Sequence, residues 1–118
     1  MILVNVPLNY GKLHKWSLQV RADKGNRCAM CGCEPDGTFW KRIEAHHIES
    51  KEERPDLIYD TKNGIPLCRT CHTSVHGGQF FLEHESHPGR IDSLKAFYQQ
   101  KKEILIGIME KNGWEHPA

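Results

Sequence analysis

Apolar residues at helical spacing mark the first element of the chain. In the stretch GKLHKWSLQVRADK, residues 11–24, large apolar side chains recur at roughly helical intervals. They are Leu13, Trp16, Leu18 and Val20. This spacing predicts an N-terminal helix over residues 11–24.

The middle of the chain changes from helical spacing to alternation and turns. Residues 38–48, TFWKRIEAHHI, mix β-branched, aromatic and alternating positions, which predicts a strand ending near two adjacent histidines. The polar stretch 49–64 predicts a loop closed by Asn63-Gly64, a strong turn pair. Residues 65–68, IPLC, predict a short extended segment, and residues 69–76, RTCHTSVH, predict a short helix. The predicted order is strand, long loop, short strand and helix.

Residues 92–112, DSLKAFYQQKKEILIGIMEKN, carry the clearest helical pattern. Asp92 or Ser93 can cap this helix and Gly113 can end it. Its apolar stripe consists of Leu94, Phe97, Tyr98, Leu105, Ile108 and Met109. We expect it to pack on the core. Its basic residues are expected on a solvated face, although they could touch phosphates: Lys95, Lys101 and Lys102.

Composition limits the size and class of the protein. A chain of 118 residues predicts one small domain, spanning residues 1–118. With 38% hydrophobic residues its core would be thin, and domains of this size often need a metal or a disulfide. The net charge of +1 gives no strong nucleic-acid signal by itself. The interrupted apolar start does not fit a signal peptide and no stretch is long enough to span a bilayer, so a cytoplasmic location without membrane contact is expected.

Four of the five cysteines form two CxxC pairs. CAMC contains Cys28 and Cys31, and CRTC contains Cys68 and Cys71. Four thiolates are a tetrahedral set matched to zinc, and a filled coordination sphere predicts a structural rather than a catalytic ion. A redox CxxC is the alternative, but the long βαβ pattern typical of that motif is absent from the sequence. Cys33 falls outside the pair spacing and is expected to be a spare thiol.

The histidines between and after the two pairs carry a resemblance. His46 and His47 lie in IEAHHI, and Asn63 and His72 lie in the stretch NGIPLCRTCHTSVH. Framed by the four cysteines, this arrangement resembles the zinc-bearing, four-cysteine branch of the HNH endonucleases, which are ββα-metal nucleases that include phage-type members. The resemblance implies an α+β fold: a ββα core over residues 28–76 stapled by zinc, with flanking N- and C-terminal helices.

The resemblance also implies a role for each residue. His46 and His72 would bind a catalytic divalent ion, His47 would act as the general base, and Asn63 would brace the loop that orients the base. Neighbouring residues of a strand face opposite sides, which allows the two adjacent histidines to divide these tasks. Relatives often carry aspartate at the position of His46. A nitrogen ligand there favours Mn²⁺, Ni²⁺, Co²⁺ or Zn²⁺ over Mg²⁺.

Two further residues have open roles. His76 lies four residues after His72, on the same helix face, and could be a third ligand, a phosphate contact or a surface histidine at the helix end. Glu44 lies two residues before His46 on the same strand face. It could be a ligand or support one, but a half-exposed strand residue is the favoured interpretation.

The function implied by the resemblance is a metal-dependent DNA endonuclease that leaves 5′-phosphate and 3′-hydroxyl ends. Phosphate contacts are expected from basic residues near the site, Lys41, Arg42 and Arg69 among them. A unit this small would read few bases, so weak sequence specificity or nicking is expected, unless a dimer or a phage-packaging or restriction partner adds contacts. The alternative is a non-catalytic zinc module that binds nucleic acid or protein.

Overall fold

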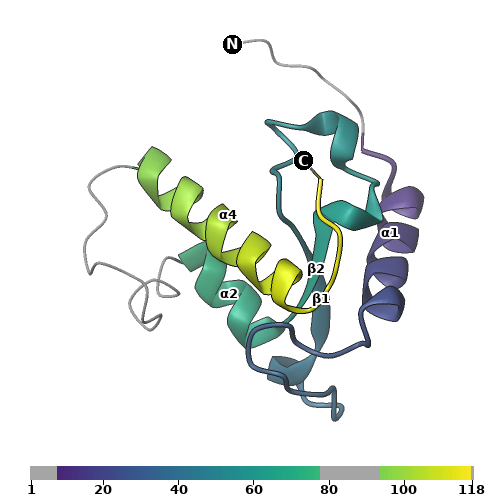
Figure 1. The fold of residues 1–118 in the computed structure, drawn as a ribbon. Helices are drawn as coiled ribbons and strands as arrows, with labels where there is room; N and C mark the ends of the chain where they lie inside the picture. The colour runs from purple at the N-terminus through teal and green to yellow at the C-terminus, as the bar shows by residue number, and fades with distance from the viewer. Residues whose placement is uncertain (1–7, 78–93, 118) are drawn as a thin grey trace.

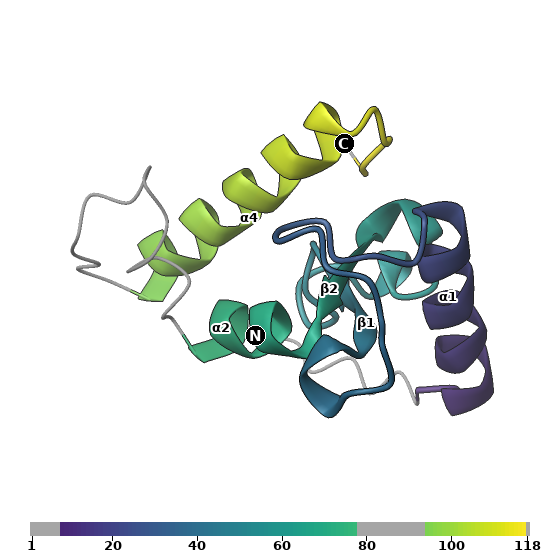
Figure 2. The same cartoon turned by 90° about the horizontal axis from the view of Figure 1, so that it is seen from below.

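The computed structural model describes residues 8–77 and 94–117. Within them, a two-stranded antiparallel sheet lies between α1 (Tyr10–Asp23) on one side and α2 (Arg69–Gly77) with α4 (Leu94–Lys111) on the other (Figures 1 and 2). The predicted α+β class is confirmed. In this described part of the chain, no helix is both long and apolar enough to cross a membrane.

Helix α1 begins where Asn9 caps it. The Asn9 side-chain oxygen accepts a hydrogen bond from the Lys12 amide at 3.0 Å, which satisfies one of the free amides of the first turn. Trp16 and Val20 are buried against the sheet, whereas Leu18 is 47% exposed and lies off this buried face. The Trp16 indole nitrogen also donates to the Asp60 carbonyl at 2.8 Å. Helix α1 is thereby tied to the loop between the strands.

The sheet is shorter than the sequence predicts. Strand β1 (Ile43–His47) pairs with β2 (Gly64–Cys68), with Ile43 opposite Cys68 and His47 opposite Gly64. After Cys68 the chain turns directly into α2, so residues 38–42 have no strand to pair with. The predicted strand over 38–48 is therefore wrong at its start, where residues 39–41 form a 3₁₀ turn instead.

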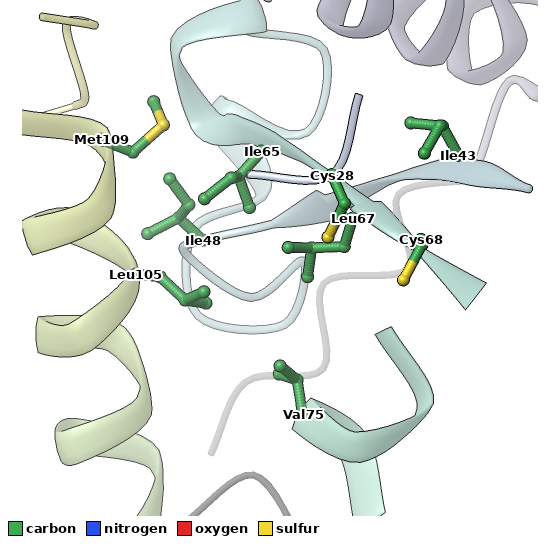
Figure 3. Close-up of a cluster of buried hydrophobic side chains, with 9 residues drawn as sticks. All are labelled: Cys28, Ile43, Ile48, Ile65, Leu67, Cys68, Val75, Leu105 and Met109. Carbon is green, nitrogen blue, oxygen red and sulfur yellow. The ribbon is translucent and has the colours of Figure 1, made fainter. Parts of the chain in front are cut away.

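The core lies between the sheet and helices α2 and α4. Side chains of α2 and α4 pack against Ile48, Ile65 and Leu67 of the sheet region (Figure 3). These helical side chains are Val75 of α2 and Leu105 and Met109 of α4. Ile108 packs against the cluster in a partly buried position. Helix α4 thus completes the core, as predicted.

Some sequence predictions concern residues outside the described ranges. Among these are the cap residues proposed for the last helix and the other members of its apolar stripe. They are Asp92 and Ser93, and the side chains of Leu94, Phe97 and Tyr98. The side chain of Lys95 also lies outside the described part.

Gly64 permits close packing of α1 on the first residue of β2. A Cβ atom at this position would lie 2.4 Å from Val20 Cγ2 and 2.9 Å from Trp16 Cζ2. Real Cβ atoms do not approach carbon atoms so closely, because the interior is already packed at high density. Glycine is therefore required for Trp16 to reach the sheet beside His47.

Candidate active site

Four cysteine sulfurs converge at one end of the sheet. Their Sγ atoms lie within 4.8 Å of one another. Cys28 and Cys31 come from a turn after α1, and Cys68 and Cys71 come from the turn of the chain from β2 into α2. In each turn a backbone amide donates to sulfur at 3.4 Å: Cys31 N to Cys28 Sγ, and Cys71 N to Cys68 Sγ. These bonds stabilise thiolates, which are the metal-binding form of cysteine. The predicted four-cysteine metal site is present in the fold.

One sulfur–sulfur distance matches the spacing of a tetrahedral zinc site. A tetrahedral ion with Zn–S bonds of about 2.3 Å has sulfur–sulfur edges of about 3.8 Å. Cys31 Sγ and Cys68 Sγ, which come from different turns, are 3.8 Å apart. Cys33 is half-buried and does not belong to the four-sulfur set found among the described residues. Burial raises the pKa of its thiol to about 12, so Cys33 stays protonated.

Three imidazoles form a second cluster beside the first. Ring nitrogens of His46, His72 and His76 lie within 4.8 Å of one another. His72 Nε2 and His76 Nε2 are 3.1 Å apart, and the His46 ring centroid is 5.2 Å and 5.1 Å from theirs. Burial, with the neighbouring imidazoles second, lowers the pKa of His46 to about 2. Burial also lowers the pKa of His76. Both are therefore neutral near pH 7, as metal ligands must be.

Glu44 orients His72 from the strand side. Its Oε1 lies 2.9 Å from His72 Nδ1, and because a carboxylate only accepts, Nδ1 must carry the proton. The Nε2 of His72 then points at His76. Burial raises the pKa of Glu44, but hydrogen bonds and charge from His72 and Arg69 outweigh it and the pKa is lowered. This carboxylate–histidine pair is typical of metal sites. Glu44 was expected from the sequence to be a half-exposed strand residue, and it instead contacts the histidine cluster.

His47 faces the opposite side of β1 from His46. Its ring stacks on Trp16 with centroids 3.9 Å apart and planes inclined by 8°. His47 Nε2 lies 2.9 Å from the Ile58 carbonyl oxygen, which only accepts, so Nε2 carries the proton and Nδ1 is the unprotonated nitrogen. Burial lowers the pKa of His47. The ring is therefore neutral near pH 7, with a fixed tautomer and a fixed orientation.

Asn63 holds the loop that carries the Ile58 carbonyl. Its side chain is fully buried, accepts from Glu49 N at 2.7 Å and donates to the carbonyl oxygens of Glu49 at 3.1 Å and Leu57 at 3.2 Å. The Asn63 carbonyl also accepts from Ile48 N at 3.1 Å. Both ends of the loop are thereby fixed to one side chain, next to the residue that orients His47.

Removal of the Asn63 amide should be costly. In Asn63→Ala a buried amide and two carbonyl groups lose their partners, so we expect the free energy of unfolding to fall by about 3 kcal/mol. Urea denaturation of the metal-loaded chain measures this. The matched control is Asn112→Ala, because the exposed Asn112 side chain makes one local bond to Ile108 O, and its loss should cost about 0.5 kcal/mol or less. Equal losses in the two variants would refute the bracing role.

A groove of about 1120 Å³ joins these groups. The groove is lined by His46, His47, His72 and His76, and also by His14. Its basic rim comes from several elements: Arg21, Arg42, Lys51, Arg69, Lys101 and Lys102. Of the predicted phosphate contacts, Arg42 and Arg69 belong to the rim, whereas Lys41 is not among the described lining residues and its ammonium is 3.5 Å from Asp36. Four glutamates also line the groove, Glu44, Glu49, Glu52 and Glu53, so its lining carries a small excess of positive charge, which favours a polyanion such as DNA.

Comparison with known proteins identifies the central segment. Residues 28–78 match the family model described as HNH endonuclease, and this range contains both cysteine pairs, the three clustered histidines and His47. Over this segment the chain is similar to the HNH endonuclease family. This HNH-like segment resembles a nuclease-type domain, and α1 and α4 lie outside the matched range on either side of it.

One curated relative covers more of the chain than the HNH segment. It is a protein of Acanthamoeba polyphaga mimivirus described as a DNA mismatch repair protein mutS homolog, 28% identical over 92 residues. The match covers 70% of this chain, but the chain spans only about 8% of the length of that relative. No solved structure matches this chain.

Not every histidine or contact around the HNH site follows from the sequence. His84 and His87 lie outside the described residues. Sequence reasoning missed Trp16 as the stacking partner of His47, the Ile58 carbonyl that fixes its tautomer, and the approach of Lys101 and Lys102 to the groove. The first had a weak signal, since a tryptophan on the apolar side of α1 must bury its ring somewhere. The Ile58 carbonyl had none, because any residue supplies one.

Proposed function

We propose that this protein is a metal-dependent DNA endonuclease that hydrolyses phosphodiester bonds and leaves 5′-phosphate and 3′-hydroxyl ends. One observation carries the proposal: three imidazoles converge within 4.8 Å, and a fourth with a fixed tautomer lines the same groove. Similarity of residues 28–78 to the HNH endonuclease family supports nuclease chemistry. The mismatch repair description of the viral relative supports DNA as the substrate.

The donor set suits a catalytic divalent ion. His72 Nε2 and His76 Nε2 face each other at 3.1 Å, a distance at which a proton on one of them or a shared cation must lie between the two nitrogens. We assign His46, His72 and His76 as ligands, with Glu44 holding His72. An ion bound there would stabilise negative charge on the phosphate and on the leaving oxygen.

In this mechanism His47 activates the attacking water. Its Nδ1 accepts the proton of the water while Nε2–H remains bonded to the Ile58 carbonyl. That bond strengthens as the ring becomes an imidazolium, because a charged donor binds a carbonyl more tightly. Stacking on Trp16 prevents rotation of the ring, and Asn63 keeps the loop of Ile58 in place. Arg42, Arg69 and the rim lysines bind flanking phosphates without reading sequence. We therefore expect weak specificity.

The four-cysteine site has a structural role in this proposal. Zinc held by Cys28, Cys31, Cys68 and Cys71 would fix the first turn of α2, and His72 directly follows the last of these ligands. The same ion would join residues 28–31 to the end of β2. Its role is therefore to hold His72 where His46 can meet it.

Cutting of supercoiled plasmid DNA tests the proposed function. The zinc-loaded chain should convert supercoiled plasmid to nicked or linear forms when Mn²⁺ is added. Excess EDTA should stop the reaction. A non-catalytic zinc module is the alternative, and it predicts DNA or protein binding without cutting under any divalent ion. The absence of cutting with Mn²⁺, Ni²⁺, Co²⁺, Zn²⁺ and Mg²⁺ alike would reject the enzyme.

The identity of the activating metal follows from the ligands. Three nitrogen donors favour Mn²⁺, Co²⁺, Ni²⁺ or Zn²⁺, whereas Mg²⁺ prefers oxygen. We expect the initial rate of plasmid cutting at equal metal concentration to be at least about tenfold higher with Mn²⁺ or Ni²⁺ than with Mg²⁺. His46→Asp supplies an oxygen ligand and should reduce the ratio of the cutting rate with Mn²⁺ or Ni²⁺ to the cutting rate with Mg²⁺. The highest rate with Mg²⁺ in the parent chain would contradict the ligand assignment of His46.

A further inference from the structure

Two large aromatic side chains are exposed beside the groove. Phe39 and Trp40 are 52% and 57% exposed, and they contact each other edge to face with centroids 5.1 Å apart. They belong to the 3₁₀ turn Phe39–Lys41, which replaces the start of the predicted strand. Single exposed apolar residues are ordinary, but adjacent aromatics rimmed by charge are typical of binding surfaces. The family chemistry assigned above does not use them.

Two guanidinium groups lie over the Phe39 ring. Arg42 Cζ is 5.6 Å and Arg69 Cζ is 5.4 Å from its centroid, within the range of cation–π attraction. The arginine side chains remain 63% and 41% exposed. The patch, defined as Phe39, Trp40, Arg42 and Arg69, therefore presents aromatic faces and positive charge together. These are the two features that bind bases and phosphates of single-stranded nucleic acid.

The patch is connected to the histidine cluster by direct contacts. Arg42 and Arg69 each contact the Glu44 carboxylate, at 3.1 Å and 3.4 Å. Glu44 in turn accepts from His72 Nδ1 at 2.9 Å. The Thr70 hydroxyl donates to the Trp40 carbonyl at 3.3 Å, which ties the turn to the start of α2. A strand with a phosphate at the histidines would therefore place a neighbouring nucleotide at the patch.

We propose that Phe39 and Trp40 form a stacking platform for an unpaired base next to the cleaved phosphate. The proposal rests on the proposed endonuclease function and names its substrate class: single-stranded or locally unpaired DNA. In an intact duplex the faces of the bases are covered by their neighbours, so only an unpaired base can lie on an aromatic ring. Arg42 and Arg69 bind the adjacent phosphates.

Equilibrium binding without cutting tests the platform. The probes are a fluorescein-labelled single strand of about 12 nucleotides, within the range that such surfaces cover, and the same strand in a duplex. Fluorescence anisotropy is measured on the full zinc-loaded chain with no other divalent ion added. We expect the parent to bind the single strand more tightly. Trp40→Ala should weaken that binding about tenfold while changing duplex binding by less than about twofold.

Matched variants separate stacking from misfolding. Trp40→Phe retains an aromatic face and should restore most of the single-strand affinity. Leu18→Ala removes an exposed apolar side chain that does not line the groove and should leave binding unchanged. Zinc content and the circular dichroism spectrum should match the parent in all three variants, because both side chains are exposed.

Three results would overturn the platform. The first is that the parent binds both probes equally. The second is that Trp40→Ala binds the single strand as tightly as the parent. The third is that Trp40→Ala abolishes self-association of the chain in sedimentation, which would make the patch a protein contact. None of these depends on catalysis. Plasmid cutting by the parent tests the endonuclease separately, so failure of one proposal is distinguishable from failure of the other.

Discussion

His47→Ala is expected to reduce the rate of plasmid cutting by a factor of about 10² to 10⁴, the usual contribution of a general base. The reason is that, among the described residues lining the groove, His47 is the histidine outside the three-imidazole cluster whose tautomer is fixed by a backbone carbonyl. The effect should appear at saturating Mn²⁺, because the three-imidazole cluster remains intact. The measurement is the initial rate of conversion of supercoiled to nicked plasmid.

Controls for His47→Ala come from the same chain. Zinc content should stay at the parent value, since none of the four sulfurs contacts His47. His116→Ala removes a histidine that is not among the described groove-lining residues and should cut at the parent rate. If His47→Ala cuts as fast as the parent, another group is the base. If it cuts slowly but regains activity at higher Mn²⁺, His47 affects metal binding rather than water activation.

Cys68→Ser is expected to remove the bound zinc and the cooperative thermal transition together. Cys68 is 3% exposed, belongs to the core cluster and ends β2 where α2 begins. Metal binding at a four-thiolate site contributes directly to folding, because the unfolded chain lacks the site. We expect the free energy of unfolding to fall by about 4 kcal/mol or more. Metal analysis and a circular dichroism melt measure the two effects.

Cys33→Ser is the matched control for the zinc site. Its thiol lies near the four ligands in sequence but outside their set, and burial keeps it protonated with a pKa of about 12. The variant should retain one zinc per chain and melt close to the parent temperature. Loss of zinc in Cys33→Ser, or full retention of zinc and of the transition in Cys68→Ser, would show that the ligand set is wrong.

The elements that the sequence predicted well are those with local signals. Two CxxC pairs bring four sulfurs together because each pair forms its own turn and the metal chemistry requires four. The helix that follows the second pair places His72 and His76 on one face because they are four residues apart. The apolar stripe of the last helix ends in the core, at Leu105 and Met109. Each of these inferences needs only spacing.

The contacts that the sequence could not predict depend on segments far apart in the chain. Glu44 meets His72 only because β1 and β2 pair in one register, which puts position 44 beside the first turn of α2. Trp16 meets His47 only because Gly64 lets α1 approach the sheet. The prediction of a strand over residues 38–42 failed for a similar reason, because it depended on a pairing partner elsewhere in the chain. Aromatic and β-branched residues 38–42 favour extended structure, but β2 is too short to pair with them.

The flanking helices contribute contacts to the site of the HNH-like segment. Helix α1 supplies the ring that stacks on His47, and α4 supplies Lys102, whose ammonium is 3.0 Å from Glu49. Glu49 is itself bonded to Asn63 through its backbone amide and carbonyl. A lysine of the last helix is thereby connected to the loop brace. Lys102 was expected on a solvated face of the helix, but its side chain is half-buried at the groove.

Anomalous diffraction from crystals of His47→Ala soaked with Mn²⁺ and a short DNA strand tests the central claim most directly. The account predicts an Mn²⁺ peak bonded to ring nitrogens of His46, His72 and His76, with a phosphate oxygen on the same ion. It predicts a separate zinc peak among Cys28, Cys31, Cys68 and Cys71. Manganese bound elsewhere, with the three imidazoles free of metal and phosphate, would contradict it.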